Sequence, residues 1–374
     1  MTMPDHLWID QPGQLPLVVE ALRSAPWVAM DTESNSMFVY RERLCLLQIN
    51  AGGSLFVIDG LALAPEAPSR ALDSLKPQFE RRDRALYLHG GEYDVAVFRR
   101  DFGITLQGIW DSQQAASLLG WEKTGYGAAV ERVCQVVLDK AWTQYDWGSR
   151  PIAPGALQYA LDDVVYLPQV GAALQAEIES HDLVEEMQIA CQAVADASWS
   201  GGFDPAGFWR IKGVRELKPH SQSVLASLWV WRDQLARDAN LPPGRLINNQ
   251  LLFTLARVAP TNYGLLKKLG MRGWFMSAHG EALIDCVKGA STDPGSLPPR
   301  PRARDVAEHE EARETRLKDW RRSEAERRQV PLQVVLPARS LEYLKQHGVT
   351  DQEIPQLGAK RLRLYGDDLR RLCS

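Results

Sequence analysis

Short apolar runs alternate with periodic segments in the first half of the chain. Residues 27–30 form one such run after Pro26, and residues 85–88 form another. Apolar runs of this length predict buried strands. Residues 155–180 instead carry apolar side chains at three- and four-residue spacing, which predicts a long amphipathic helix that Pro168 can kink.

The second half of the chain has the apolar spacing of helices throughout. Stripes at residues 225–236, 251–256, 265–269 and 282–286 predict a small all-α domain with short connections. Residues 291–303 are rich in Ser, Gly, Pro and Arg, as linkers are. Residues 304–328 are dense in Arg and Glu and predict an exposed helix, after which a leucine-rich segment follows. We therefore predict four parts: residues 1–210, 211–296, 297–328 (linker and charged helix) and 329–374.

Length and composition restrict the class of protein. A chain of 374 residues predicts two or three domains. No stretch approaches the ~20 apolar residues of a membrane-spanning helix, and the N-terminus lacks the basic and apolar regions of a signal peptide. The five cysteines are far apart and form no zinc pattern. These features predict reduced thiols in a cytoplasmic protein that is not bound to a membrane.

Charge is divided unevenly between the two halves. Residues 1–210 hold 15 Lys and Arg against 28 Asp and Glu, a net charge of −13, whereas residues 211–374 hold 28 against 19, a net charge of +9. The basic half is a candidate for contacts with a phosphate backbone. A solvated basic surface explains the same numbers, so charge alone leaves both interpretations open.

Four carboxylates and one tyrosine are the candidate chemistry of the acidic half. Asp31 and Glu33 are two apart at the end of a predicted strand and would face the same side. Asp94 falls in the first turn of a helix that follows the second strand. Tyr159 and Asp163 are four apart on the predicted long helix, so they share a face. Each feature alone has an ordinary explanation, such as surface acids, a helix-terminus acid or a half-buried aromatic.

Neighbouring residues are expected to play lesser parts. Thr32 would point away from the two acids, and Asp162, rotated about 100° from Asp163 on a helix, would be solvated. His89 is expected to be structural, because no second His or Cys stands at ligand spacing.

The complete set points to phosphodiester hydrolysis with two metal ions. Two cations about 4 Å apart can stabilise both the attacking and the leaving oxygen. Carboxylate ligands suit Mg²⁺ or Mn²⁺, and four of them carry a charge of −4, which balances two divalent ions. The Tyr159 hydroxyl would orient the attacking water, because an unperturbed phenol stays protonated near neutral pH.

At these positions the chain resembles the DEDD exonucleases of the tyrosine subgroup. Residues 31–33 (Asp-Thr-Glu) resemble the first motif of that group, residues 89–94 the second, and residues 159–167, with Tyr-x-x-x-Asp spacing, the third. The flanking segments 44–49 and 146–151 are similar as well. Within this group the chain resembles the ribonuclease D family over nearly its whole length, including two helical HRDC-like domains in the second half.

The resemblance implies a fold, an activity and roles for the residues. The expected fold is an α/β ribonuclease-H-like domain, with a mixed central sheet flanked by helices, followed by two small all-α HRDC-like domains. Asp31 would bridge two metal ions, Glu33 and Asp163 would complete one site, and Asp94 would serve the other. The expected activity is that of a monomeric 3′→5′ exoribonuclease, which releases nucleoside 5′-monophosphates and trims tRNA precursors and other small RNAs.

Two other functions stay open at this stage. The first is a 3′→5′ exodeoxyribonuclease, because the motifs act on phosphate and do not separate RNA from DNA. The second is a catalytically silent nucleic-acid-binding protein that keeps only the fold. Parallel digestion of RNA and DNA strands would distinguish all three.

Overall fold

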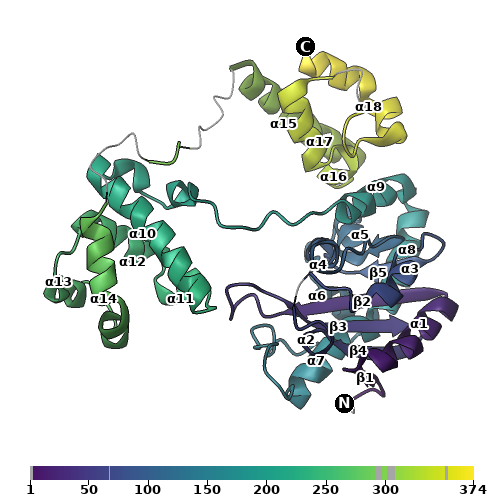
Figure 1. The fold of residues 1–374 in the computed structure, drawn as a ribbon. Helices are drawn as coiled ribbons and strands as arrows, with labels where there is room; N and C mark the ends of the chain where they lie inside the picture. Colours follow the sequence, from purple (N-terminus) through teal and green to yellow (C-terminus); the bar gives the residue numbers. More distant parts are fainter. Residues whose placement is uncertain (1–2, 67, 291–296, 301–307, 350–352) are drawn as a thin grey trace. The chain divides into compact units, whose positions relative to one another are not determined.

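The apolar runs of the first half form one six-stranded mixed sheet in a computed structural model of the chain (Figure 1). The structure describes residues 3–66, 68–290, 297–300, 308–349 and 353–374. The strand order is β1-β4-β3-β2-β5-β6, with β3 antiparallel to β2 and β4 and the other pairs parallel. The strands are β1 (Leu7–Ile9), β2 (Trp27–Ser34), β3 (Leu44–Ala51), β4 (Ser54–Asp59), β5 (Ala85–Leu88) and β6 (Ile109–Asp111).

Helices cover both faces of this sheet. On one face, Val28 and Met30 of β2 join a large apolar core with α1 (Leu15–Ser24) and α4 (Glu92–Phe102). On the other face, Ala29 packs with Val164 and Leu167 of two later helices, α7 (Pro154–Val165) and α8 (Leu167–Ser180). The remaining helices of this half are α2 (Gly60–Leu63), α3 (Lys76–Phe79), α5 (Ser112–Leu118), α6 (Tyr126–Cys134) and α9 (Val184–Ala195). The predicted mixed sheet flanked by helices is confirmed.

The prediction of one long helix over residues 155–180 was wrong, because the segment forms two helices. α7 ends at Val165, Tyr166 separates the two, and α8 begins at Leu167 with Pro168 in its first turn. Proline lacks an N–H, and its ring collides with the carbonyl four residues earlier, so a continuous helix is disfavoured at this point. Pro154 occupies the first turn of α7, where its missing N–H costs nothing.

The second half is helical, as predicted. Its helices are α10 (Pro219–Asp238), α11 (Pro243–Leu246), α12 (Asn249–Val258), α13 (Tyr263–Lys268), α14 (Gly273–Lys288), α15 (Glu308–Arg328), α16 (Leu332–Val335), α17 (Ala338–His347) and α18 (Gly358–Cys373). Parts of the predicted linker, residues 291–296 and 301–307, lie outside the described residues. Leu317 of α15 is fully buried, so this charged helix has an apolar face instead of being exposed all round. Among the described helices, none has the length and apolar character to cross a bilayer.

The chain divides into two compact units. One comprises Met1–Ser34, Arg43–Trp199 and Val306–Ser374, and the other comprises Asn35–Glu42 and Ser200–Asp305. The short segment Asn35–Glu42 directly follows β2, the strand of Asp31 and Glu33, but it belongs to the second unit and contacts α10 and α11. Its Tyr40 hydroxyl donates to the buried carboxylate of Asp233 at 2.8 Å, and Arg245 lies over the Phe38 ring. The predicted domain boundaries were drawn without this segment and stay a prediction.

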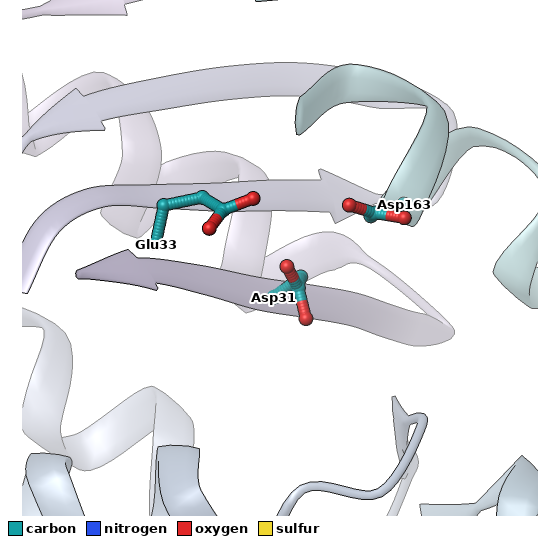
Figure 2. Close-up of side chains that lie close together, drawn as sticks. All are labelled: Asp31, Glu33 and Asp163. Atoms are coloured by element: carbon teal, nitrogen blue, oxygen red, sulfur yellow. The ribbon is translucent and has the colours of Figure 1, made fainter. Parts of the chain in front are cut away.

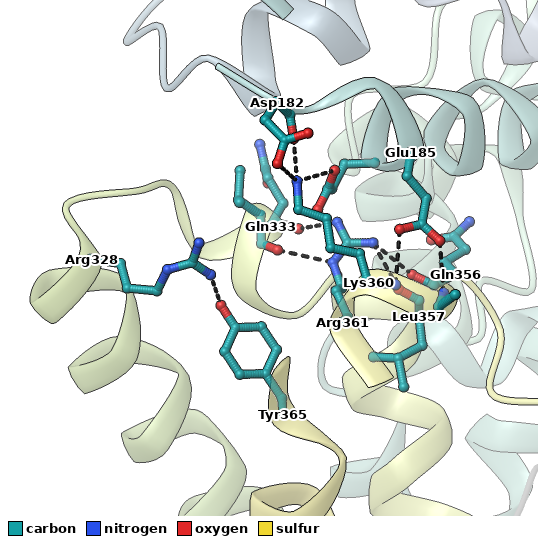
Figure 3. Close-up of polar contacts among 12 residues, drawn as sticks. Asp182, Glu185, Arg328, Gln333, Gln356, Leu357, Lys360, Arg361 and Tyr365 are labelled. Atoms are coloured by element: carbon teal, nitrogen blue, oxygen red, sulfur yellow. Dashed lines mark hydrogen bonds and ion pairs between the residues drawn. The ribbon is translucent and has the colours of Figure 1, made fainter. Parts of the chain in front are cut away.

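Within the first unit, the C-terminal helices dock against α9 (Figure 3). The Glu185 carboxylate accepts the backbone N–H groups of Ala359 and Lys360, at 2.7 and 2.9 Å, in the first turn of α18. A carboxylate at this position satisfies unpaired helix donors and complements the helix dipole. The Lys360 ammonium lies 3.0 Å from the Asp182 carboxylate and 3.4 Å from that of Glu186. These contacts attach the last helices to the sheet domain.

Candidate active site

Strand β2 presents Asp31 and Glu33 on the face of the sheet that α7 covers. Strand alternation puts both side chains on that face and Thr32 on the other, as predicted. The register places Asp31 opposite Gln48 and Glu33 opposite Leu46 on β3. Both acids are only partly exposed.

Helix α7 brings a third carboxylate to the pair. Asp163 lies close to Asp31 and Glu33, and one oxygen from each of the three lies within 4.8 Å of the others (Figure 2). Two of these residues come from a strand and the third from a helix more than 120 positions later in the chain. Three carboxylates at this separation repel one another unless a cation lies between them.

Asp94 stands apart from this group of three. The turn before α4 contains Gly90 in the left-handed region (φ 67°), and at Gly91 a Cβ would lie 2.6 Å from the Leu88 side chain. These glycines let the chain turn from β5 into α4, so that Asp94 falls in the first helical turn, as predicted. Its buried carboxylate accepts a hydrogen bond from the Thr32 hydroxyl.

Tyr159 lies one turn before Asp163 on α7. Its ring packs on the buried Trp147 with 6.2 Å between ring centroids. Burial, together with the charges of Asp163 and Glu33, raises the pKa of the Tyr159 phenol above its ordinary value. The hydroxyl therefore stays protonated at neutral pH and serves as a hydrogen-bonding group, not as a base.

The carboxyl groups are held under conditions that disfavour their charge. Burial and the neighbouring Asp163 raise the pKa of Glu33 to about 9, and burial with the charge of Asp162 raises the pKa of Asp163 to about 8. Burial and Asp163 also raise the pKa of Asp31 well above its ordinary range. Burial raises the pKa of Asp94 to about 6, although the Thr32 hydrogen bond opposes the shift. Such a donor set fits a divalent cation, which would restore the ionised forms.

Asp162 and His89 are two neighbours of the candidate residues that were expected to play lesser parts. Asp162 was expected to be solvated, but it is half-buried, and its carboxylate accepts the Gln158 amide at 2.7 Å. The packing of α7 against the sheet causes this, because it leaves little of the helix exposed. His89 was expected to be structural, and its contacts are compatible with that role: its Nδ1 lies 2.8 Å from the Ser112 hydroxyl and its ring packs on Tyr126.

An ion pair that the sequence did not reveal holds the loop before α7. The Arg150 guanidinium bonds both oxygens of the Asp59 carboxylate, at 2.6 and 2.7 Å. It also donates to the carbonyls of Cys45 and Trp147. Bidentate pairs of this kind fix orientation as well as distance. Arg150 was noted only as part of a resembling segment, since no local pattern connects it with a residue 91 positions earlier.

Known proteins share this architecture. A family model described as 3′-5′ exonuclease matches residues 7–179, and one described as HRDC domain matches residues 221–287. Ribonuclease D of Escherichia coli (strain K12) is 30% identical over 308 residues, which cover 79% of this chain and 78% of that protein. The chain belongs to the ribonuclease D family.

Other members of the family align over almost the full chain. Ribonuclease D of Gluconacetobacter diazotrophicus is 26% identical and is matched over 98% of this chain and 92% of its own length. The crystal structure of Escherichia coli RNase D, described as an exoribonuclease involved in structured RNA processing, superposes with a TM-score of 0.72 at 26% identity, covering 99% of this chain and 98% of the other. This member of the ribonuclease D family is accordingly a metal-dependent 3′→5′ exoribonuclease.

Proposed function

We propose that Asp31, Glu33, Asp94 and Asp163 hold two divalent ions, Mg²⁺ or Mn²⁺, at which the terminal phosphodiester of RNA is hydrolysed. The observation that carries this proposal is the approach of three carboxylates to within 4.8 Å of one another from β2 and α7. Asp31, on whose carboxyl group the charges of Asp163, Asp94 and Glu33 all act, would bridge both ions. Glu33 and Asp163 would complete one site and Asp94 the other.

The ions, when bound, would favour ionisation of the attacking water and offset the charge that develops on the leaving 3′-oxygen. The residues of the chain orient the reacting groups. Thr32 holds the Asp94 carboxylate by a hydrogen bond, which fixes its direction before any ion arrives. The protonated Tyr159 hydroxyl positions the water for attack in line with the leaving oxygen. Because water attacks the phosphorus and the 3′-oxygen leaves, hydrolysis releases nucleoside 5′-monophosphates.

We further propose that the substrates are tRNA precursors and other small RNAs with free 3′ ends, processed by a monomer in the cytoplasm. The excess of Lys and Arg over residues 211–374, which include the HRDC domain, supports contacts with a phosphate backbone. The description of the Escherichia coli relative as acting in structured RNA processing agrees with this substrate class. All five cysteines are free thiols, which is compatible with a reducing compartment.

The proposal is tested by digesting RNA labelled at the 3′ end or at the 5′ end, with Mg²⁺ and with EDTA. We expect immediate release of a labelled 5′-mononucleotide from the 3′-labelled strand, a shrinking ladder from the 5′-labelled strand, and no cleavage in EDTA. A DNA strand of matched sequence serves as the control for sugar preference. Equal or faster digestion of DNA would contradict the proposed substrate, and cleavage that persists in EDTA would contradict the metal site.

Tyr159→Phe should lower kcat on the order of 10²-fold, at the lower end of what a positioned proton-transfer or water-orienting group contributes. The substitution removes only the hydroxyl and keeps the ring packed on Trp147. Because Tyr159 supplies no metal ligand, the increase in Tm that MnCl₂ produces should equal that of the parent. A variant with unchanged kcat would exclude the hydroxyl from the reaction, and a lost metal response would show instead that it supports the ligands.

A further inference from the structure

Gln48 is a fully buried side chain beside the carboxylates whose hydrogen-bonding groups are unused. It lies near the middle of β3, and none of its surface is exposed. Neither its amide nitrogen nor its amide oxygen has a hydrogen-bond partner among the residues that the structure describes. A buried amide with two N–H donors and one acceptor is costly to leave unpaired, so it calls for a partner in the working enzyme.

The register of the sheet shows where that partner stands. Asp31 on β2 is directly opposite Gln48 on antiparallel β3. Residues opposite one another in an antiparallel pair share a face, and their Cβ atoms lie about 4.5–5.5 Å apart. The same face is covered by α7, which carries Asp163. Gln48 therefore lies between a strand and a helix that both supply carboxylates.

Asn50, two residues further along β3, provides an informative contrast. It is a buried amide on the same face, but its groups are satisfied by the fold: its nitrogen donates to the Val164 carbonyl at 3.0 Å, and its oxygen accepts the Gly53 N–H at 2.9 Å. Asn50 thus has a structural explanation that Gln48 lacks.

We propose that Gln48 is a positioning residue for Asp31, whose ligating carboxylate accepts a hydrogen bond from the Gln48 amide when the site holds metal. A partner of this kind, one step removed from the ion, orients a ligand. The bond would select the Asp31 rotamer that faces Asp163 and Glu33. The inference rests on the proposed role of Asp31 as a metal ligand.

The test compares Gln48→Leu with Asn50→Leu in the full-length protein. Tm is measured without metal and during titration with MnCl₂, and kcat and KM are measured on a short single-stranded RNA. For Gln48→Leu we expect a Tm without metal that is equal to the parent's or higher, because an unpaired amide has been replaced by an apolar side chain of similar volume. We also expect the MnCl₂ midpoint to rise and kcat to fall, each roughly 10- to 100-fold, with KM unchanged.

Asn50→Leu should show the opposite pattern. Its Tm without metal should fall, because the Val164 carbonyl and the Gly53 N–H lose their partner, while the MnCl₂ midpoint stays that of the parent. If Gln48→Leu shows this pattern too, Gln48 is merely structural and the proposal is wrong.

Two further variants complete the comparison. Gln48→Glu keeps the shape of the side chain but replaces the N–H donor by an acceptor. It should therefore weaken the rise in Tm with MnCl₂ at least as much as Gln48→Leu does. An unchanged MnCl₂ midpoint in this variant would overturn the proposal, even if Gln48→Leu did not fold. Asp31→Asn separates this inference from its basis. If Asp31→Asn responds to MnCl₂ as the parent does, the proposed metal site itself is wrong. If Asp31→Asn loses the response but the Gln48 variants keep it, the metal site stands and Gln48 has no part in it.

Discussion

Asp31→Asn should reduce the rate of RNA hydrolysis by at least ~10³-fold and leave the protein folded. Asp31 belongs to the group of three carboxylates and lies opposite Gln48 on the neighbouring strand. The charge stabilisation that bound ions supply is worth several kcal/mol, and a loss of about 4 kcal/mol corresponds to roughly 10³-fold in rate. Asparagine has the same shape as aspartate but is a weak ligand without charge.

The stability of Asp31→Asn should move in the opposite direction from its activity. Burial and the charge of Asp163 disfavour ionisation of Asp31 in the folded protein without metal. A neutral amide removes that repulsion, so the Tm measured in EDTA should equal or exceed that of the parent. Activity is followed by mononucleotide release and folding by circular dichroism.

Asp162→Asn is the matched control for this variant. Asp162 is the half-buried neighbour of Asp163, but its carboxylate is engaged with the Gln158 amide and is not one of the three that converge. It should keep most of the parental activity. A rate for Asp31→Asn above about a tenth of the parent's, a loss of less than ~1.4 kcal/mol of transition-state stabilisation, would contradict the assigned role.

Local geometry is the part of the site that could be predicted from the sequence. Side chains two apart on a strand share a face, and so do side chains four apart on a helix. To predict that Asp31 shares a face with Glu33, and Tyr159 with Asp163, it was therefore enough to recognise a strand and a helix. The strands over 27–30 and 85–88 were recognisable because short apolar runs are bounded by turn residues.

Pairing across the fold could not be predicted in the same way. That the Asp94 carboxylate would bond Thr32, or that Gln48 would face Asp31, depends on strand register and helix placement. Register is set by which apolar faces are buried together, and it joins positions far apart in the chain. A single sequence contains no local signal for such pairs.

The segment Asn35–Glu42 illustrates the same limit at the level of domains. The predicted part comprising residues 1–210 includes this segment, which packs with the helical unit. The cause is a set of specific contacts, such as Tyr40 with Asp233, that are 193 positions apart. Proximity along the chain therefore does not indicate which unit this segment packs with.

Without metal, the free energy of unfolding should fall as the pH rises from about 6 to 9. The folded protein holds Glu33 with a pKa of about 9 and Asp163 with a pKa of about 8, whereas both ionise near pH 4 to 4.5 in an unfolded chain. The folded state thus binds more protons than the unfolded state throughout this window. The stability that these protonated groups contribute is complete below the unfolded pKa and is lost as the pH rises through the folded pKa.

The slope of this loss approaches about 1.4 kcal/mol per pH unit for each carboxyl group that stays protonated only when folded. Thermal unfolding in EDTA at closely spaced pH values measures it. Asp163→Asn removes one of the groups and should flatten the curve. A stability in EDTA that is constant or increases between pH 6 and 9 would show that the carboxyl groups are already ionised without a cation.

Bound metal should reverse the trend. The ionised carboxylates become ligands, so metal binding releases protons and strengthens as the pH rises. The difference in Tm between MgCl₂ and EDTA should consequently grow from pH 6 to pH 9, and RNA hydrolysis at limiting Mg²⁺ should increase over the same range. Asp163→Asn should lose both the growing difference and the activity, because Asp163 supplies one side of the three-carboxylate group. A parental protein whose Tm difference shrinks over this range would contradict binding through ionised carboxylates, whatever its activity.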